Sequence, residues 1–179
     1  PPLILWNHRW EHDKGPEAFF RALFALADRG ETFELAVLGS HSRRYPPVFD
    51  EARERLADRI VHWGFAEDFG EYARWLWAAD VLPVTSRHDF FGISVAEAVY
   101  CGTFPLLPER LAYPELLPEP WQRECFYGSE DELVAALSTA LKEGPQVTPE
   151  RLAEAIARFD WSMMAPVYDR KLEEIAGGR

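Results

Sequence analysis

Long apolar runs are absent from this 179-residue sequence, and so are the glycine-rich signatures of two large classes of nucleotide-binding protein. A membrane-spanning helix needs roughly 18 or more successive apolar residues, so we expect no membrane partner. No G-x-G-x-x-G follows the first apolar run and no G-x-x-x-x-G-K-[ST] occurs, which argues against a dinucleotide-dependent dehydrogenase and a P-loop NTPase. The first residues also lack a basic segment followed by a small-residue cleavage site, so we expect no export signal.

Cysteine and positive charge are both scarce. The two cysteines, Cys101 and Cys125, lie far apart in otherwise apolar segments, which predicts buried free thiols in a reducing compartment. We therefore expect a cytoplasmic protein. The chain carries 19 Lys and Arg against 30 Asp and Glu, a formal net charge of -11 that repels the phosphates of a nucleic acid. Local basic residues can still hold one phosphate group, so a nucleotide ligand is compatible with this charge.

What the sequence does contain is a regular alternation of short apolar runs and amphipathic segments. Residues 3–6 are typical of a buried strand, and Gly15-Pro16-Glu17 opens an amphipathic helix that should end near Gly30. Further strands are predicted at residues 33–38, 60–63, 81–84 and 104–107, and further helices at 48–56, 69–79 and 92–101. Strands separated by roughly 10–15 helical residues indicate βαβ units. The expected fold class is therefore α/β, with a doubly wound, mostly parallel sheet of the Rossmann-like kind.

The remainder of the chain is expected to be mainly helical. The proline-rich residues 108–120 predict an irregular connection. A last short strand is predicted at residues 125–127, and helices at 130–142, 149–159 and 163–175. The last two helices should be separated near Asp160-Trp161-Ser162, where an Asp or Ser side chain can cap the final helix. A chain of 179 residues suits one core, so we expect residues 1–179 to form a single domain.

Two loops at the carboxyl ends of predicted strands carry chemically useful residues, and ligands of open parallel sheets bind beyond these ends. The first loop holds Arg9 and Lys14 just before a helix N-terminus, where free backbone N–H groups and the helix dipole favour an anion. This arrangement predicts a site for a diphosphate. The alternative is a solvated turn in which Arg9 pairs with Glu11 or Asp13.

The second loop leads into the helix predicted at residues 92–101 and contains two carboxylates at positions i and i+8, Asp89 and Glu97. Between them, Gly92 allows a ligand to approach the backbone, and free N–H groups after it can meet phosphate or sugar hydroxyls. Glu97 can accept two hydrogen bonds from a vicinal diol such as ribose. The alternative is that Asp89 interacts only with the helix dipole and that Glu97 is a solvated surface residue.

These residues give the chain a family resemblance. The run HDFFGISVAEAVYCGTFPLLP resembles the donor-site signature of retaining glycosyltransferases of the GT-B fold, in which an acidic residue and a glycine turn precede a glutamate. The segment AADVLPVTS resembles the strand that enters this signature, and HWGF resembles the segment near the nucleotide base. Arg9 with Lys14-Gly15 resembles the pair that grips the donor diphosphate. Four matches in the family's order are more specific than any one of them.

A narrower resemblance covers almost the whole chain. The segments WNHRWEHDKGPEAFF, VHWGF, FFG, EAVYCG and YPE resemble the tRNA-queuosine mannosyltransferase family. That family implies GDP-mannose as donor and the queuosine base of a tRNA as acceptor. It also implies that this chain is the nucleotide-sugar-binding half of the enzyme, and that tRNA binds only together with a separate N-terminal domain. One departure is Asp89, where the general signature has Glu; the other is that the N-terminal domain has no counterpart here.

The resemblance also implies a role for each site residue. Arg9 and Lys14 would neutralise the diphosphate leaving group and Asp89 would orient the hexose hydroxyls, so these three are the catalytic candidates. Glu97 would hold the ribose. The other donor-binding candidates are Gly64, Phe65, Phe91, Gly92 and Ile93. Because the basic pair supplies the charge stabilisation, we expect no metal ion and no other cofactor.

Other functions can be weighed against the same residues. His8 and His12 have the i, i+4 spacing of a metal site, but they lie in a turn and lack the adjacent Glu of a zinc-protease motif. Asp89 and Glu97 share one strand-to-helix turn, whereas the acid and base of a glycoside hydrolase flank a scissile bond in a cleft. A catalytically inactive α/β nucleotide-binding or interaction module remains an alternative, because a fold does not guarantee an activity.

Overall fold

The computed structural model of the chain describes residues 1–117 and 119–177, which form a six-stranded sheet flanked by helices. The strand order is β3-β2-β1-β4-β5-β6, and each neighbouring pair is parallel. The expected doubly wound parallel sheet is confirmed, because the strands run outward in both directions from β1 and β4. The strands are β1 Leu3–Trp6, β2 Glu34–Leu38, β3 Ile60–Gly64, β4 Val81–Pro83, β5 Phe104–Pro108 and β6 Phe126–Tyr127.

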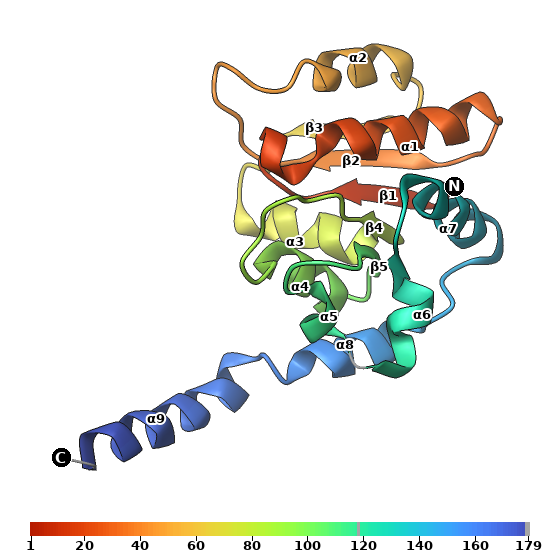
Figure 1. The fold of residues 1–179 in the computed structure, drawn as a ribbon. Helices are drawn as coiled ribbons and strands as arrows, with labels where there is room; N and C mark the ends of the chain where they lie inside the picture. Colours follow the sequence, from red (N-terminus) through yellow and green to blue (C-terminus); the bar gives the residue numbers. More distant parts are fainter. Residues whose placement is uncertain (118, 178–179) are drawn as a thin grey trace.

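Helices cover both faces of the sheet (Figure 1). On one face, α1 (Pro16–Asp28) packs against α2 (Val48–Arg55) and α7 (Glu130–Glu143). On the other face, α4 (Ile93–Tyr100) contacts both α3 (Phe69–Ala78) and α8 (Pro149–Ala157). A sheet covered on both faces needs apolar side chains at successive positions, and every residue of β1 and β5 is buried.

Aromatic packing holds α1 and α2 on the sheet. Trp6, the last residue of β1, is fully buried and contacts Phe19 and Phe20 of α1 and Phe49 of α2, with ring centroids 4.9, 6.3 and 5.6 Å away. Buried aromatic rings of this size contribute much of a core's apolar area. The loop that follows β1 therefore begins at a residue, Trp6, whose position is fixed by core packing.

The structure corrects part of the expected connection at residues 108–120. That segment includes a short helix, α5 (Tyr113–Leu116), and a 3-10 turn, η2 (Glu119–Trp121); Pro118 lies outside the described residues. Pro114 sits in the first turn of α5, where a proline needs no N–H partner, so a proline-rich segment can still be helical. Cys125 ends the helix α6 (Gln122–Cys125) instead of starting β6.

The final helix, α9 (Trp161–Gly177), extends away from the rest of the chain (Figure 1) and has no buried residue. Asp160 caps it as expected, because its Oδ1 accepts a hydrogen bond from the Ser162 N–H at 2.8 Å. None of the described helices combines the length and apolar character that crossing a membrane requires. Both cysteines are free thiols as expected, although Cys101 is only half-buried.

Candidate functional site

The loops after β1 and β4 lie together where the strand order reverses. β1 and β4 are parallel neighbours, but the chain continues from β1 to β2 on one side and from β4 to β5 on the other. A crevice forms at such a point beyond the carboxyl ends of the strands. Two hydrogen bonds join the loops: Thr85 Oγ1 donates to the Gly15 carbonyl at 2.9 Å, and the Arg87 N–H donates to the Asp13 carbonyl at 2.7 Å.

Gly15 makes this contact between the loops possible. Its φ of +68° lies in the left-handed region, and an added Cβ would lie 2.3 Å from the carbonyl oxygen of Thr85. Only glycine tolerates both conditions. The Lys14-Gly15 pair therefore brings the lysine to the adjacent loop.

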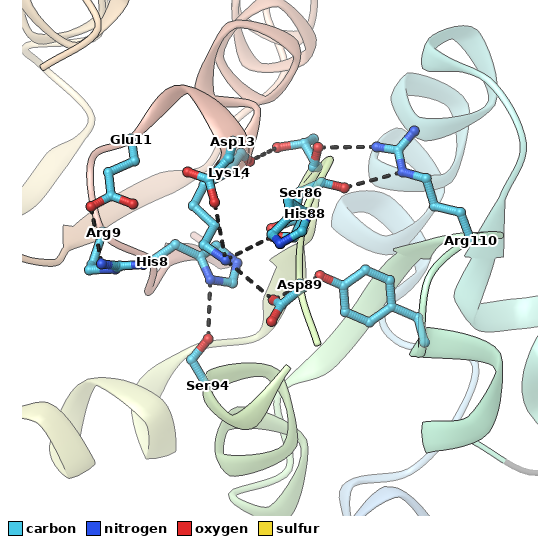
Figure 2. Close-up of polar contacts among 12 residues, drawn as sticks. His8, Arg9, Glu11, Asp13, Lys14, Ser86, His88, Asp89, Ser94 and Arg110 are labelled. Atoms are coloured by element: carbon cyan, nitrogen blue, oxygen red, sulfur yellow. Dashed lines mark hydrogen bonds and ion pairs between the residues drawn. The ribbon is translucent and has the colours of Figure 1, made fainter. Parts of the chain in front are cut away.

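Lys14 lies between the carboxylates of both loops (Figure 2). Its Nζ donates to the carbonyl of His88 at 3.0 Å and lies 3.6 Å from Asp89 Oδ2 and 3.8 Å from Asp13 Oδ2. Only 12% of the lysine side chain is exposed. Tertiary structure thus joins two predicted site residues, Lys14 and Asp89, at the crevice.

Arg9 is placed apart from that cluster. Its Nη1 lies 3.1 Å from Glu11 Oε1, and the two side chains are 62% and 44% exposed. This is the pairing that the sequence left open as an alternative to diphosphate binding. An exposed ion pair contributes only about 0–1 kcal/mol, so an incoming phosphate group would displace Glu11 at little cost.

Asp89 has a second partner that the sequence did not suggest. Tyr113 Oη, from α5, donates to Asp89 Oδ2 at 3.1 Å, and the tyrosine is fully buried. Burial raises the pKa of Tyr113 well above its usual value, and the Asp89 carboxylate raises it further. The phenol therefore stays protonated and acts as a donor.

Glu97 is held in a similar way from α3. Tyr72 Oη donates to Glu97 Oε2 at 2.9 Å. Burial raises the pKa of Tyr72 strongly, and the charge of Glu97 adds to the effect. Glu97 is therefore not a freely solvated helix residue, which was the alternative considered from the sequence.

The N-terminus of α4 is open toward the crevice. Gly92 is the N-cap, with φ +80°, and no side chain caps the helix. Among the described residues, nothing accepts a hydrogen bond from the backbone N–H groups of Ile93 and Ser94. Phe91 and Ile93 are 40% and 68% exposed on either side of this turn. Free N–H groups at a helix N-terminus form a suitable site for an anion.

His8 belongs to the site although the sequence indicated no such role. It is buried, and its Nδ1 lies 3.1 Å from the hydroxyl of Ser94 in the first turn of α4 (Figure 2). Burial lowers the pKa of His8 to about 4, and the charge of Lys14 lowers it as well. The imidazole is therefore neutral. Within residues 1–117 and 119–177, no group of three or more His, Cys, Asp or Glu side chains is arranged for metal binding.

Arg110 is another site residue that sequence analysis missed. It follows β5, and its Nε and Nη2 donate to the carbonyls of Ser86 and Thr85, both at 3.1 Å. These carbonyls belong to the loop after β4, so Arg110 helps to hold the backbone that carries Asp89. No spacing rule identifies such a residue, because the contact joins two loops that follow different strands.

A mostly apolar hollow lies beside the crevice at the ends of β2 and β3. We call it the base-side hollow; its volume is about 430 Å³. Phe65 and Phe69 line it and are 70% and 77% exposed, whereas Gly64 ends β3 immediately before Phe65. A hollow with exposed aromatic rings suits a flat heterocycle. Its lining residues are Asn7, Leu38, Gly39, Phe65, Ala66, Glu67, Asp68, Phe69 and Tyr72.

Comparison with known proteins gives a consistent result. The family model described as "Glycosyl transferases group 1" matches residues 1–143. The tRNA-queuosine alpha-mannosyltransferase of Drosophila melanogaster is 34% identical over 134 residues, which is 75% of this chain and 34% of the fly protein. The chain therefore spans about a third of the length of this curated relative.

Solved structures share the fold at low sequence identity. A sucrose-phosphate synthase from Thermosynechococcus elongatus superposes with a TM-score of 0.81 at 19% identity, over 99% of this chain and 46% of that one. The pneumococcal O-GlcNAc transferase, solved with UDP and GlcNAc, superposes with a TM-score of 0.79 at 15% identity, over 98% of this chain and 36% of that one.

Proposed function

Because the chain belongs to the glycosyl transferases group 1 family, we propose that it is the donor-binding half of a retaining glycosyltransferase. It takes a hexose from a nucleoside-diphosphate sugar. The observation that carries the proposal is the position of Lys14, 3.6 Å from Asp89 in the loop that leads to the open N-terminus of α4. One cation, one carboxylate and free N–H groups at a single crevice suit a phosphorylated sugar.

Each part of the donor has a matching group. Lys14, Arg9 and the N–H groups around Gly92 and Ile93 take the diphosphate and offset the negative charge that develops on the leaving group. Asp89 accepts hydrogen bonds from the hexose hydroxyls and Glu97 from the ribose. The reaction then needs no metal ion and no other cofactor, because these groups supply the electrostatic stabilisation.

The base-side hollow favours guanine, and hence GDP-mannose, as the donor. Glu67 lines the hollow, and among the described residues nothing pairs with its carboxylate. A carboxylate accepts two hydrogen bonds from adjacent donors. Guanine offers such a pair on one edge, its ring N–H and its amino group, whereas uracil and adenine do not. Phe65 and Phe69 provide apolar contact for the ring.

The acceptor proposal rests on the mannosyltransferase relative. If the chain has the same acceptor, it modifies queuosine in a tRNA, and the surface that binds the tRNA comes from a further N-terminal domain. The net charge of -11 supports this division, because a tRNA needs a basic surface. The domain described here would then bind the donor but transfer little or no sugar alone.

An inactive binding or interaction module is the second candidate, and nucleotide titration separates the two. We expect calorimetric titration of the chain to give saturable binding of GDP, and weaker binding of UDP and ADP. The variant Glu67→Gln should lose the preference for GDP, because an amide accepts only through one oxygen. An absence of saturable binding by any of the three nucleotides would favour the interaction module.

Transfer is tested separately with GDP-mannose and queuosine-containing tRNA. We expect mannosyl-queuosine only when the N-terminal domain of the same enzyme is present, because closing two domains around the donor excludes water and positions the acceptor. Efficient transfer by residues 1–179 alone would refute this division of labour.

A further inference from the structure

Each carboxylate of the candidate donor site accepts a hydrogen bond from a tyrosine hydroxyl. Tyr72 of α3 donates to Glu97 at 2.9 Å, and Tyr113 of α5 donates to Asp89 at 3.1 Å. The two tyrosines come from different helices, which follow different strands of the sheet. Neither belongs to the segment that contains the two carboxylates, so the pairing exists only in the folded chain.

We propose that Tyr72 and Tyr113 are positioning residues, which orient Glu97 for ribose recognition and Asp89 for sugar recognition. This inference rests on the proposed function and assigns the site two residues that work through the carboxylates. In each pair the hydroxyl occupies one carboxylate oxygen. The other carboxylate oxygen is left for the donor.

For Glu97, the contact reduces a long side chain to one orientation. Glutamate has several rotatable bonds, and ordering them on binding costs affinity. Tyr72 lines the base-side hollow and also a second groove of about 460 Å³ between α3 and α4, which Glu97 lines as well. The tyrosine therefore stands between the position of the base and the carboxylate. A ribose attached to a base in the hollow meets Glu97 already oriented.

For Asp89, Tyr113 and Lys14 together hold one oxygen of the carboxylate. Tyr113 Oη and Lys14 Nζ approach the same oxygen, Oδ2, at 3.1 and 3.6 Å. Oδ1 has no partner among the described residues and is left for a sugar hydroxyl. The ring of Tyr113 also supports the turn itself, because an added Cβ on Gly92 would lie 3.1 Å from its Cε1.

The test for Tyr72 compares GDP with 2′-deoxy-GDP, since only the first offers Glu97 a vicinal diol. We expect the native chain to prefer GDP, and Tyr72→Phe to lose about 3–10-fold in GDP affinity, the range for one hydrogen bond. The affinity for 2′-deoxy-GDP should change much less, so the preference shrinks. A merely structural role would weaken both ligands equally and leave the ratio unchanged.

The test for Tyr113 compares the affinity for GDP-mannose with the affinity for GDP. Tyr113→Phe should lower the affinity for GDP-mannose relative to GDP by about 3–10-fold, because only the sugar nucleotide reaches Asp89 with a hexose. Tyr45→Phe is the matched control. Tyr45 also donates to a carboxylate, Asp50 at 2.8 Å, but this exposed pair lies outside the site. Both ratios should stay at the native value in that variant.

Each failure has a distinct signature. No GDP binding by the native chain overturns the proposed function. If the native chain prefers GDP to 2′-deoxy-GDP and Tyr72→Phe keeps this preference, the role of Tyr72 is overturned. If Tyr113→Phe keeps the native ratio of GDP-mannose affinity to GDP affinity, the role of Tyr113 is overturned. Should Tyr72→Phe fail to fold, Glu97→Asp withdraws the carboxylate from the hydroxyl by one methylene. Glu97→Asp should also lose the preference for GDP over 2′-deoxy-GDP. A native ratio of these two affinities in Glu97→Asp would contradict the proposal.

Discussion

At the scale of single residues, Lys14 is held by contacts with the loops after β1 and β4. It is nearly enclosed and is the cation closest to Asp89, whereas Arg9 is exposed and paired with Glu11. We expect Lys14→Ala to weaken GDP binding by about 1.5–3 kcal/mol, the range for hydrogen bonds to charged groups. Arg9→Ala should weaken it as well, provided that Arg9 leaves Glu11 for the diphosphate. Calorimetric titration measures both changes.

A control for these substitutions is Lys171→Ala. Lys171 pairs with Glu174 at 3.2 Å on the exposed surface of α9, so its removal should leave GDP affinity unchanged. Native affinity in both Lys14→Ala and Arg9→Ala would rule out the diphosphate assignment.

His8 provides a pH-dependent prediction. Its pKa is about 4 in the folded chain against 6.5 for the free side chain, so below pH 6.5 the unfolded chain binds a proton that the folded chain does not. Stability must then fall as the pH drops from about 6.5 to 4, by up to about 3 kcal/mol from this residue. We expect urea unfolding of His8→Asn to show a weaker loss over this range than the native chain. Parallel pH curves would show that His8 makes no such contribution.

At the scale of elements, the site depends on how closely the loops after β1 and β4 approach. Gly15→Ala would place a methyl group 2.3 Å from the Thr85 carbonyl in a left-handed conformation. Gly30→Ala is the matched control, because Gly30 has φ +73° but nothing within 4 Å of the added Cβ. We expect about 1–2 kcal/mol of destabilisation from the backbone conformation in both variants. The clash in Gly15→Ala should cost a further 1–3 kcal/mol or so.

Chemical denaturation of the two variants measures this difference. GDP affinity should fall in Gly15→Ala and remain native in Gly30→Ala, since only the first forces the two loops apart. Equal free energies of unfolding in the two variants would mean that the loops adapt without strain.

At the scale of the whole molecule, α9 stands outside the core. None of its residues is buried, and its exposed apolar side chains include Trp161, Tyr168 and Ile175 at 70%, 53% and 66%. We expect a chain ending at Asp160 to keep the native melting temperature and GDP affinity, because only Met164 and Ala165 of the helix are partly buried and little apolar area would be lost. Differential scanning calorimetry and titration test this. A fall of several degrees in melting temperature would show that α9 packs on the domain in solution.

The sequence by itself determined the layers of this protein. Apolar runs such as residues 3–6 and 104–107 are buried on both sides, so their composition directly predicts strands of a parallel sheet. Helix boundaries followed from local signals such as Pro16 after Gly15 and the Asp160 cap. The sequence also located Asp89 and Glu97 in one turn, because their spacing is local. The short helix α5 was missed, since the many prolines of residues 108–120 indicated an irregular connection.

Only the tertiary structure decided how these residues are used. Whether Arg9 or Lys14 approaches Asp89 depends on the contact of Gly15 with Thr85, which joins loops that are 70 residues apart. The same is true of Tyr72, Tyr113, His8 and Arg110, whose partners lie on other elements. A local sequence pattern encodes the period of a helix or strand, but side chains from different loops meet only after the sheet has placed the strand ends side by side.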